Sequence, residues 1–198
     1  MNRRDLLKRA GAAIIPAAFL GSRLSAAGIS RQIGTPRIAA VVYDERYSDC
    51  RSFADILVRH GATPFAVNSD CGRLWHGALR ENPVWRAGSV AGLTTDSDFL
   101  VSRACGREVG LGVSYEGAHD SRELNCVKHR FQSCAYPHEI AAALSNEDAS
   151  WAESLAQSLV RARWRNGTAI FRAPVWVETS RSHDHPGYLT SWLLEKST

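Results

Sequence analysis

Two histidines flank an aspartate in the stretch SRSHDHPGY, residues 180–188, near the end of the chain. In an extended segment His183 and His185 point to the same side, as two ligands of one metal ion must. A metal site needs a third and usually a fourth ligand. The nearest further candidates are Asp184, which points the other way, and Glu178. The following Pro-Gly pair is typical of a loop between strands, so we expect a solvated loop and no native metal ion.

A second set of polar residues follows the apolar runs of the chain. It comprises Asp44 and Glu45, Ser69 and Asp70, Thr94 and Thr95, and His119 and Asp120. Ligands of open parallel sheets bind beyond the carboxyl ends of the strands. Thr95 also precedes an expected helix, whose first backbone N–H groups favour an anion. We predict that Asp44, Glu45, Thr94 and Thr95 bind a ligand, with His119 as a general base beside Asp120. The alternative is that these residues only cap helices and form turns.

Several familiar catalytic and cofactor motifs are missing from the sequence. A dinucleotide site needs a glycine-rich turn after the first strand, and this chain has DERYSD at residues 44–49 instead. The sequence also lacks the Gly-x-Ser-x-Gly, His-Glu-x-x-His and Cys-x-x-Cys patterns of common hydrolases, zinc proteases and thioredoxins. We therefore expect no NAD or FAD and assign no cofactor.

Apolar runs and amphipathic stretches alternate along most of the chain. We expect strands at residues 37–44, 64–70, 89–95 and 111–120, and helices at 48–61, 72–82 and 96–110. Residues 121–137 are expected to form an irregular loop, followed by a helix with its apolar stripe at Trp151, Ala152, Leu155, Leu159 and Ala162. Two strands, 168–179 and 188–196, would close the chain. This alternation predicts an α/β fold, a small Rossmann-like or flavodoxin-like mostly parallel sheet with a C-terminal strand pair.

The first 27 residues have the three parts of an export signal: a basic head, an apolar run and small residues at Ser25 and Ala27 for cleavage. The stretch NRRDLLK, with Arg3 and Arg4, resembles the twin-arginine motif. Leu6 stands where phenylalanine is commoner, and Asn2 where serine or threonine is. The resemblance implies export by the twin-arginine translocase to the periplasm or the outside of the cell. We divide the chain into a signal peptide (1–27), a linker (28–36) and one α/β domain (37–198).

Removal of the leader changes the charge of the protein. The whole chain has 24 basic and 20 acidic side chains, a formal net charge of +4. Residues 1–27 contain five of the basic and one of the acidic groups, which leaves nineteen of each. The mature part is therefore neutral overall and is not expected to bind nucleic acid. No later segment is long and apolar enough for a stable membrane anchor.

The mature part resembles bacterial α/β proteins that are exported by the twin-arginine route and have no assigned activity. The stretches that carry this resemblance are YDER at residues 43–46 and AGLTT at 91–95. It implies a small exported domain without a known reaction. Our leading hypothesis is binding of a small polar ligand or an accessory role. The alternatives are a periplasmic hydrolase that uses His119 and Asp120, with or without a metal ion, and a protein–protein interaction module.

Five cysteines allow disulfides in an oxidising compartment, and the odd number leaves at least one thiol free. A β-α-β unit would bring Cys50 and Cys71 to the same edge of the sheet, which makes a bridge plausible. Cys126 and Cys134 share the expected irregular loop and could form a local bridge. Cys105 lies within an expected helix and should be a buried free thiol. A nucleophilic Cys50 at a helix N-terminus is the alternative reading of that residue.

Overall fold

The computed structural model describes residues 38–68, 70–122, 126–132, 137–145, 150–161, 175–180 and 186–196, all within one compact unit, Ile33–Thr198. The proposed signal peptide and linker, including Arg3 and Arg4, lie outside the described residues, as do His183 and His185. Among the residues described, no helix has the length and apolar character needed to cross a bilayer.

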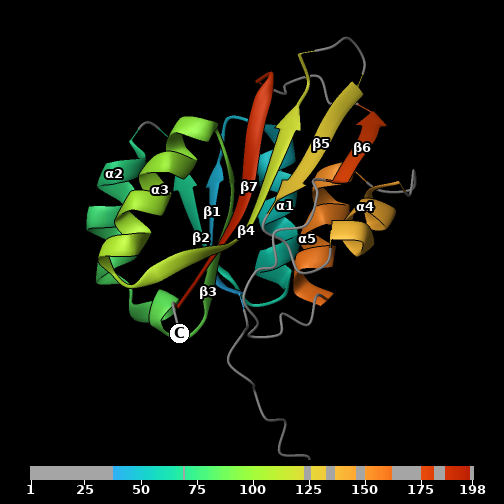
Figure 1. Cartoon of the computed structure of the whole chain (residues 1–198). Coiled ribbons are helices and arrows are strands. Elements are labelled where there is room, and N and C mark those ends of the chain that lie inside the picture. The colour runs from blue at the N-terminus through green and yellow to red at the C-terminus, as the bar shows by residue number, and fades with distance from the viewer. Residues whose placement is uncertain are drawn as a thin grey trace, which may run out of the picture. The chain divides into compact units, whose positions relative to one another are not determined.

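Strands and helical segments alternate through the first half of the domain, from Ile38 to Asp120 (Figure 1). The strands are β1 (Ile38–Asp44), β2 (Thr63–Val67), β3 (Ser89–Thr94), β4 (Leu111–Asp120), β5 (Cys126–Gln132), β6 (Val175–Ser180) and β7 (Tyr188–Lys196). The helices are α1 (Ser48–Arg59), α2 (Cys71–Leu74), α3 (Asp96–Glu108), α4 (Pro137–Leu144) and α5 (Trp151–Arg161). Two short non-α turns complete the set, the π-helix η1 (Trp75–Leu79) and the 3-10 helix η2 (Pro83–Arg86).

The seven strands form one mixed sheet in the order β2-β1-β3-β7-β4-β5-β6. Strand β1 pairs with β2 and β3 in parallel, whereas every other pair in the sheet is antiparallel. Because β7 runs against both of its neighbours, β3 and β4 have the same direction. The expected α/β class is correct, and the sheet is parallel at one end only.

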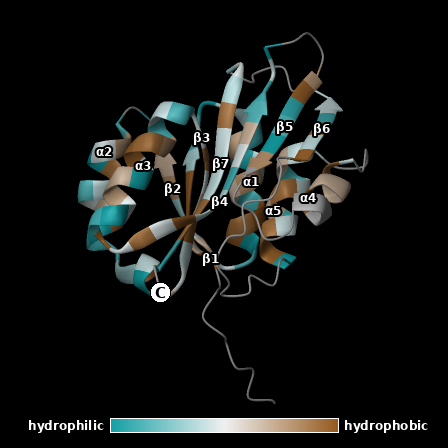
Figure 2. Cartoon of the chain, viewed as in Figure 1, coloured by the Kyte–Doolittle hydropathy of each residue, from teal (hydrophilic) through white to brown (hydrophobic). Residues whose placement is uncertain are grey.

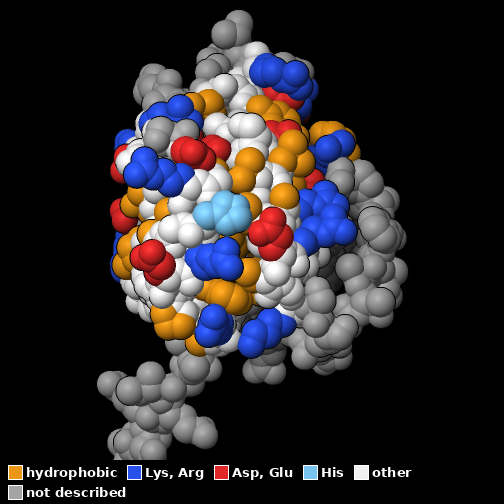
Figure 3. Space-filling view, turned by 90° about the vertical axis from the view of Figure 1, so that its left-hand side faces the viewer, with side chains coloured by type: hydrophobic (Ala, Val, Ile, Leu, Met, Phe, Trp, Pro, Cys, Tyr) orange, Lys and Arg blue, Asp and Glu red, His pale blue; other side chains and the backbone are white. Residues whose placement is uncertain are grey.

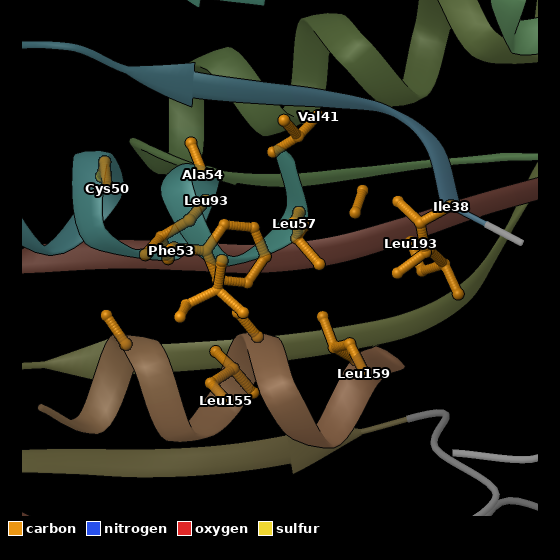
Figure 4. Close-up of a cluster of buried hydrophobic side chains, with 14 of the residues drawn as sticks. Ile38, Val41, Cys50, Phe53, Ala54, Leu57, Leu93, Leu155, Leu159 and Leu193 are labelled. Carbon is orange, nitrogen blue, oxygen red and sulfur yellow. The ribbon is translucent and has the colours of Figure 1, made fainter. Parts of the chain in front are cut away.

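Helices cover the sheet on two faces, and each face has its own apolar core. One core joins α1, α4 and α5 to the sheet, and the other joins α2, η1, η2 and α3 to the opposite face (Figure 1). In Figure 2 the apolar colour concentrates on the strands and on the helix faces that meet them. Figure 4 shows Phe53 and Leu57 of α1 near Leu155 and Leu159 of α5, in the core on one face of the sheet. The predicted apolar stripe of α5 is therefore correct for the residues described, and α1 presents a similar buried stripe.

The path of the chain puts α1 and α2 on opposite faces. After β2 the chain must return past β1 to reach β3, and it does so on the face that α1 does not cover. Cys50 consequently lies in one core and Cys71 in the other. Neither cysteine is in a disulfide, so the predicted bridge between them is wrong: the two residues share an edge of the sheet but not a face.

The remaining cysteine predictions have mixed outcomes. Cys105 is a buried free thiol, as predicted. Cys126 is also free, which contradicts the predicted local bridge to Cys134, a residue outside the described ranges. Cys126 begins strand β5 rather than lying in an irregular loop, so its neighbours are the residues of β6 across the ladder.

Two further differences concern the last third of the chain. Strand β5 lies within the stretch 121–137 that was expected to be an irregular loop, and helix α4 follows it where no element was predicted. The final two strands both exist, but they do not pair with each other: β6 pairs with β5 at the edge of the sheet, and β7 enters between β3 and β4. Residues 189–194 of β7 are buried because this strand is central. An apolar run alone does not distinguish a central strand from a terminal hairpin.

Candidate functional site

The described polar residues predicted from sequence gather at one edge of the sheet. Strands β1, β2, β3 and β4 all end at this edge, and β7 begins there. We call it the carboxyl edge. Helices α1 and α3 leave it toward opposite faces of the sheet, so β1 and β3 form a topological switch point. Ligands of open α/β sheets bind at such positions.

Asp44 ends β1 with its side chain fully buried. Its carboxylate accepts three hydrogen bonds from Arg46: the backbone N–H at 3.1 Å, Nε at 2.9 Å and Nη2 at 2.6 Å. The Arg46 side chain remains 55% exposed, whereas that of Asp44 is buried. The hydrogen bonds and charge of Asp44 raise the pKa of Arg46 above its ordinary value. The buried aspartate thus fixes a positive group at the surface of the carboxyl edge.

Thr94 and Thr95 end β3, beside Asp44 in the parallel register. Thr94 is fully buried, and its hydroxyl accepts from Trp192 Nε1 at 3.1 Å and donates to the carbonyl of Thr95 at 3.1 Å. Thr95 is partly exposed and caps α3, because its hydroxyl accepts from the backbone N–H of Asp98 at 3.4 Å and donates to the Asp98 carboxylate at 2.7 Å. Thr95 is thus the N-cap of α3, and Thr95 and Asp98 remain accessible at the edge.

The same local arrangement occurs a second time at the end of β4. Asp120 accepts from the backbone N–H of Arg122 at 3.0 Å and from Nε at 2.9 Å, and also pairs with Nη2. The hydrogen bonds from Arg122 lower the pKa of Asp120 to about 2. Here the side chain of Asp120 is 29% exposed and that of Arg122 is 73% exposed. We refer to the two pairs as the β1 clamp (Asp44, Arg46) and the β4 clamp (Asp120, Arg122).

The predicted ligand residues therefore divide into two kinds. Glu45 and Thr95 are accessible, whereas Asp44 and Thr94 are buried and support their neighbours. The loop that carries Glu45 is fixed by Arg51, whose Nη1 donates to the Glu45 carbonyl at 2.6 Å. The accessible part of the edge thus presents a guanidinium, carboxylates and a hydroxyl, which can donate and accept hydrogen bonds to a polar molecule. Asp70 caps α2 at the same edge, and Ser69 lies outside the described residues.

His119 is fully buried on the face of the sheet that α5 covers, directly opposite His129 of β5. The two Nδ1 atoms lie 2.6 Å apart, and both rings contact the indole of Trp151. His119 Nε2 lies 2.7 Å from Ser191 Oγ, and His129 Nε2 lies 2.7 Å from Thr179 Oγ1. With Tyr115, whose hydroxyl lies 2.8 Å from Ser191 Oγ, these residues form a buried chain that we call the histidine relay.

The distances of the histidine relay limit its protonation. With both rings neutral, every contact can join one donor to one acceptor: the hydroxyl of Ser191 donates to His119, His119 to His129, and His129 to Thr179. One additional proton still leaves a single hydrogen between the two Nδ1 atoms. A second would place two N–H groups against each other at 2.6 Å. The geometry therefore allows at most one positive charge on the pair.

This placement bears on the hydrolase hypothesis. His119 and Asp120 are consecutive in a strand, so their side chains point to opposite faces, and Asp120 is held by Arg122 rather than by the histidine. The nitrogens of His119 are engaged by side chains and do not face open space. The arrangement argues against a general base at His119 that acts together with Asp120.

Sequence reasoning missed Arg46, Arg122 and His129. The two arginines have a visible signal, since DER and DSR each follow an expected strand with an arginine two residues after an aspartate. The signal for His129 is the alternation in VKHRF, residues 127–131, which places Val127, His129 and Phe131 on one face of a strand.

No group of three or more histidine, cysteine, aspartate or glutamate side chains suited to a metal ion occurs within the described residues. Comparison with known proteins gave no match: no family model, no curated protein and no solved structure matches the chain.

Proposed function

We propose that this chain is an exported protein that binds a small polar ligand at the carboxyl edge, between the ends of β1 and β3. The observation that carries the proposal is the β1 clamp beside Thr95 at a topological switch point. A fully buried aspartate holds the guanidinium of Arg46 in place, so this group needs little reordering when it meets a ligand. Glu45 and Asp98 supply negatively charged hydrogen-bond acceptors, and Thr95 supplies a neutral hydroxyl.

The strand order gives this proposal a structural parallel. The order β2-β1-β3 at one end of the sheet is also the order at the start of a flavodoxin-like sheet, whose ligand binds at the β1/β3 switch point. In the present chain β7 enters antiparallel between β3 and β4. We relate the fold to the flavodoxin-like architecture on this basis.

A thermal-shift screen of amino acids, sugars, nucleosides and small carboxylic acids tests the ligand proposal. A compound that binds only the folded chain raises the melting temperature in a concentration-dependent way. Glu45→Ala and Arg46→Lys should each weaken its binding, whereas Arg107→Gln, at the opposite end of α3, should leave it unchanged. A compound that binds both edge variants as tightly as the unaltered protein occupies another site and contradicts the assignment.

The export part of the proposal rests on the first 27 residues of the sequence, in which the NRRDLLK stretch carries the resemblance to the twin-arginine motif. Replacement of Arg3 and Arg4 by lysine should leave full-length precursor in the cytoplasm, detected by cell fractionation. Arg9→Lys, outside the paired arginines, is the matched control and should be exported normally. Normal processing of the double variant would refute twin-arginine export without affecting the ligand proposal.

A further inference from the structure

A histidine and a cysteine meet on the face of the sheet that α2 and α3 cover, away from the carboxyl edge. His76 lies in the π-helix η1, which is interrupted at Gly77 by non-helical backbone angles (φ −105°, ψ −106°). Its Nε2 lies 3.9 Å from Sγ of Cys105 in α3. Single π-turns are often found at functional sites. Figure 3 views the molecule from this side.

A small cavity lies against this pair. It has a volume of about 20 Å³, and both side chains line it together with Trp75, Leu79 and Trp85. One water-sized guest needs roughly 10–15 Å³, so the cavity accepts a single atom or ion and no organic molecule. Charged side chains of both signs, Arg80 and Glu108, also line it and offset each other. A bound atom or ion must therefore be one that a thiol and an imidazole can bind next to aromatic side chains.

Without a guest, this cysteine is a neutral thiol. Burial, followed by the charge of Glu108, raises the pKa of Cys105 above its ordinary value. A reactive cysteine nucleophile needs a lowered pKa instead, so the pair does not suit nucleophilic catalysis. A soft metal ion can displace the thiol proton, because thiolate and imidazole are ligands that soft and borderline metals prefer.

The number of ligands and the charge of the cavity together select the class of metal. With bonds of about 2.3 Å to sulfur and 2.0 Å to nitrogen, atoms 3.9 Å apart subtend an angle of about 130° at the metal, between the tetrahedral angle and the near-linear angle of a two-ligand centre. Glu108 lines the cavity, but no group of three acidic, cysteine or histidine side chains suited to one metal ion occurs among the described residues. Because Arg80 and Glu108 offset each other, a divalent ion bound by one thiolate would leave a net positive charge in the cavity, which is costly. A monovalent ion leaves a neutral centre.

We propose that Cys105 and His76 form a two-ligand site for a monovalent soft metal ion of the Cu(I) class. The thiol of Cys105 loses its proton to solvent as the metal–sulfur bond forms, and neutral His76 donates the lone pair of Nε2. One proton is released for each ion bound, and no electron is transferred.

Titration of the full chain with Ag(I) in chloride-free buffer tests this proposal, since Ag(I) has the charge and ligand preference of Cu(I) without its redox chemistry. A competing small monothiol removes ions held by isolated cysteines such as Cys126. Binding should be followed by tryptophan fluorescence, because Trp75 and Trp85 line the cavity, and by the ¹⁵N shift of the His76 imidazole. We expect one retained ion per chain and release of one proton.

The variants separate this site from general thiol binding. Cys105→Ser should abolish retention, and His76→Gln, an exposed and structurally mild change, should weaken it at least tenfold. Cys126→Ser is the matched control and should bind as the unaltered chain does. Retention of Ag(I) by Cys105→Ser, unchanged affinity in His76→Gln, or displacement of Ag(I) by equimolar Zn²⁺ would each overturn the proposal.

Discussion

The two clamps share their local geometry and differ in burial. A double-mutant cycle on each can therefore test how burial changes the contribution of an ion pair to stability. In the β1 clamp the Asp44 carboxylate is 0% exposed, and in the β4 clamp that of Asp120 is 29% exposed. The variants are Arg46→Met, Asp44→Asn and their combination, with Arg122→Met, Asp120→Asn and their combination as the matched set. Methionine keeps most of the apolar stem of arginine and removes the charge.

We expect the arginine substitution to be the more costly change in the β1 clamp. Removal of one partner of a fully buried ion pair costs about 3–5 kcal/mol, because the other charge is left without compensation. In the β1 clamp the guanidinium is 55% exposed and the backbone N–H of Arg46 still donates to the carboxylate, so water can reach the gap. These features reduce the expected cost of Arg46→Met to about 2 kcal/mol.

Asp44→Asn should cost about 1 kcal/mol, because the amide oxygen of the new side chain still accepts from the backbone N–H and the guanidinium returns to water. The coupling energy of the β1 cycle should then be about 1 kcal/mol or more. Contact of Arg46 with the Tyr47 ring at 5.4 Å is lost in the single and in the double variant, and it cancels in the cycle. The β4 cycle should give a coupling energy of less than about half that value, because exposed ion pairs contribute little to stability.

Urea denaturation at neutral pH measures each free energy of unfolding. The reasoning is refuted if the two clamps have equal coupling energies. It is also refuted if Asp44→Asn destabilises the protein more than Arg46→Met, since that order would mean that the lone buried carboxylate carries no penalty.

Close contacts and charges elsewhere in the fold allow three more tests. Gly92→Ala should destabilise the protein by about 3 kcal/mol or more in urea denaturation, because an added Cβ would lie 2.2 Å from the Trp192 ring. The pKa of Asp120 is lowered, so its pair with Arg122 stabilises the fold above about pH 4 and loses this effect between about pH 4 and pH 2. Asp120→Asn should therefore remove this contribution to the acid dependence of the free energy of unfolding. The contribution should be small because Arg122 is exposed. His129→Phe should cost about 2–3 kcal/mol by leaving the opposing imidazole nitrogen buried without its partner, and a loss below about 0.5 kcal/mol would contradict the histidine relay.

The parallel end of the fold could be predicted from the sequence because its signals are local. The run from Ile38 to Asp44 is apolar and almost fully buried, and the apolar spacing of α1 and the N-cap residue Thr95 follow simple local rules. The three parallel strands are the first three of the domain, and each is followed by a helical segment, so correct elements also led to the correct class of sheet. The carboxyl edge followed from the same rules.

The antiparallel end could not be predicted in this way, because its pairings join distant parts of the chain. Strand β7 contacts β3 across about a hundred residues, and nothing in the run Tyr188–Lys196 records which strands flank it. Burial of Ser191 and Thr190 depends on that central position. Strand β5 was missed because its alternation includes charged residues on the other face. The sequence analysis therefore also missed His129, the residue that pairs with His119.

The clamps separate what local sequence and tertiary context each contribute. An aspartate at the end of a strand, with an arginine two residues later, reaches nearly the same hydrogen bonds in both places. Strand β1 lies between two parallel neighbours with helices on both faces, so its terminal carboxylate is sealed from water. Strand β4 ends where β7 and β5 flank it, and its carboxylate stays partly exposed. Hydrogen-bond geometry is thus a local property of the Asp-x-Arg pattern, whereas its contribution to stability depends on the position of the strand in the sheet.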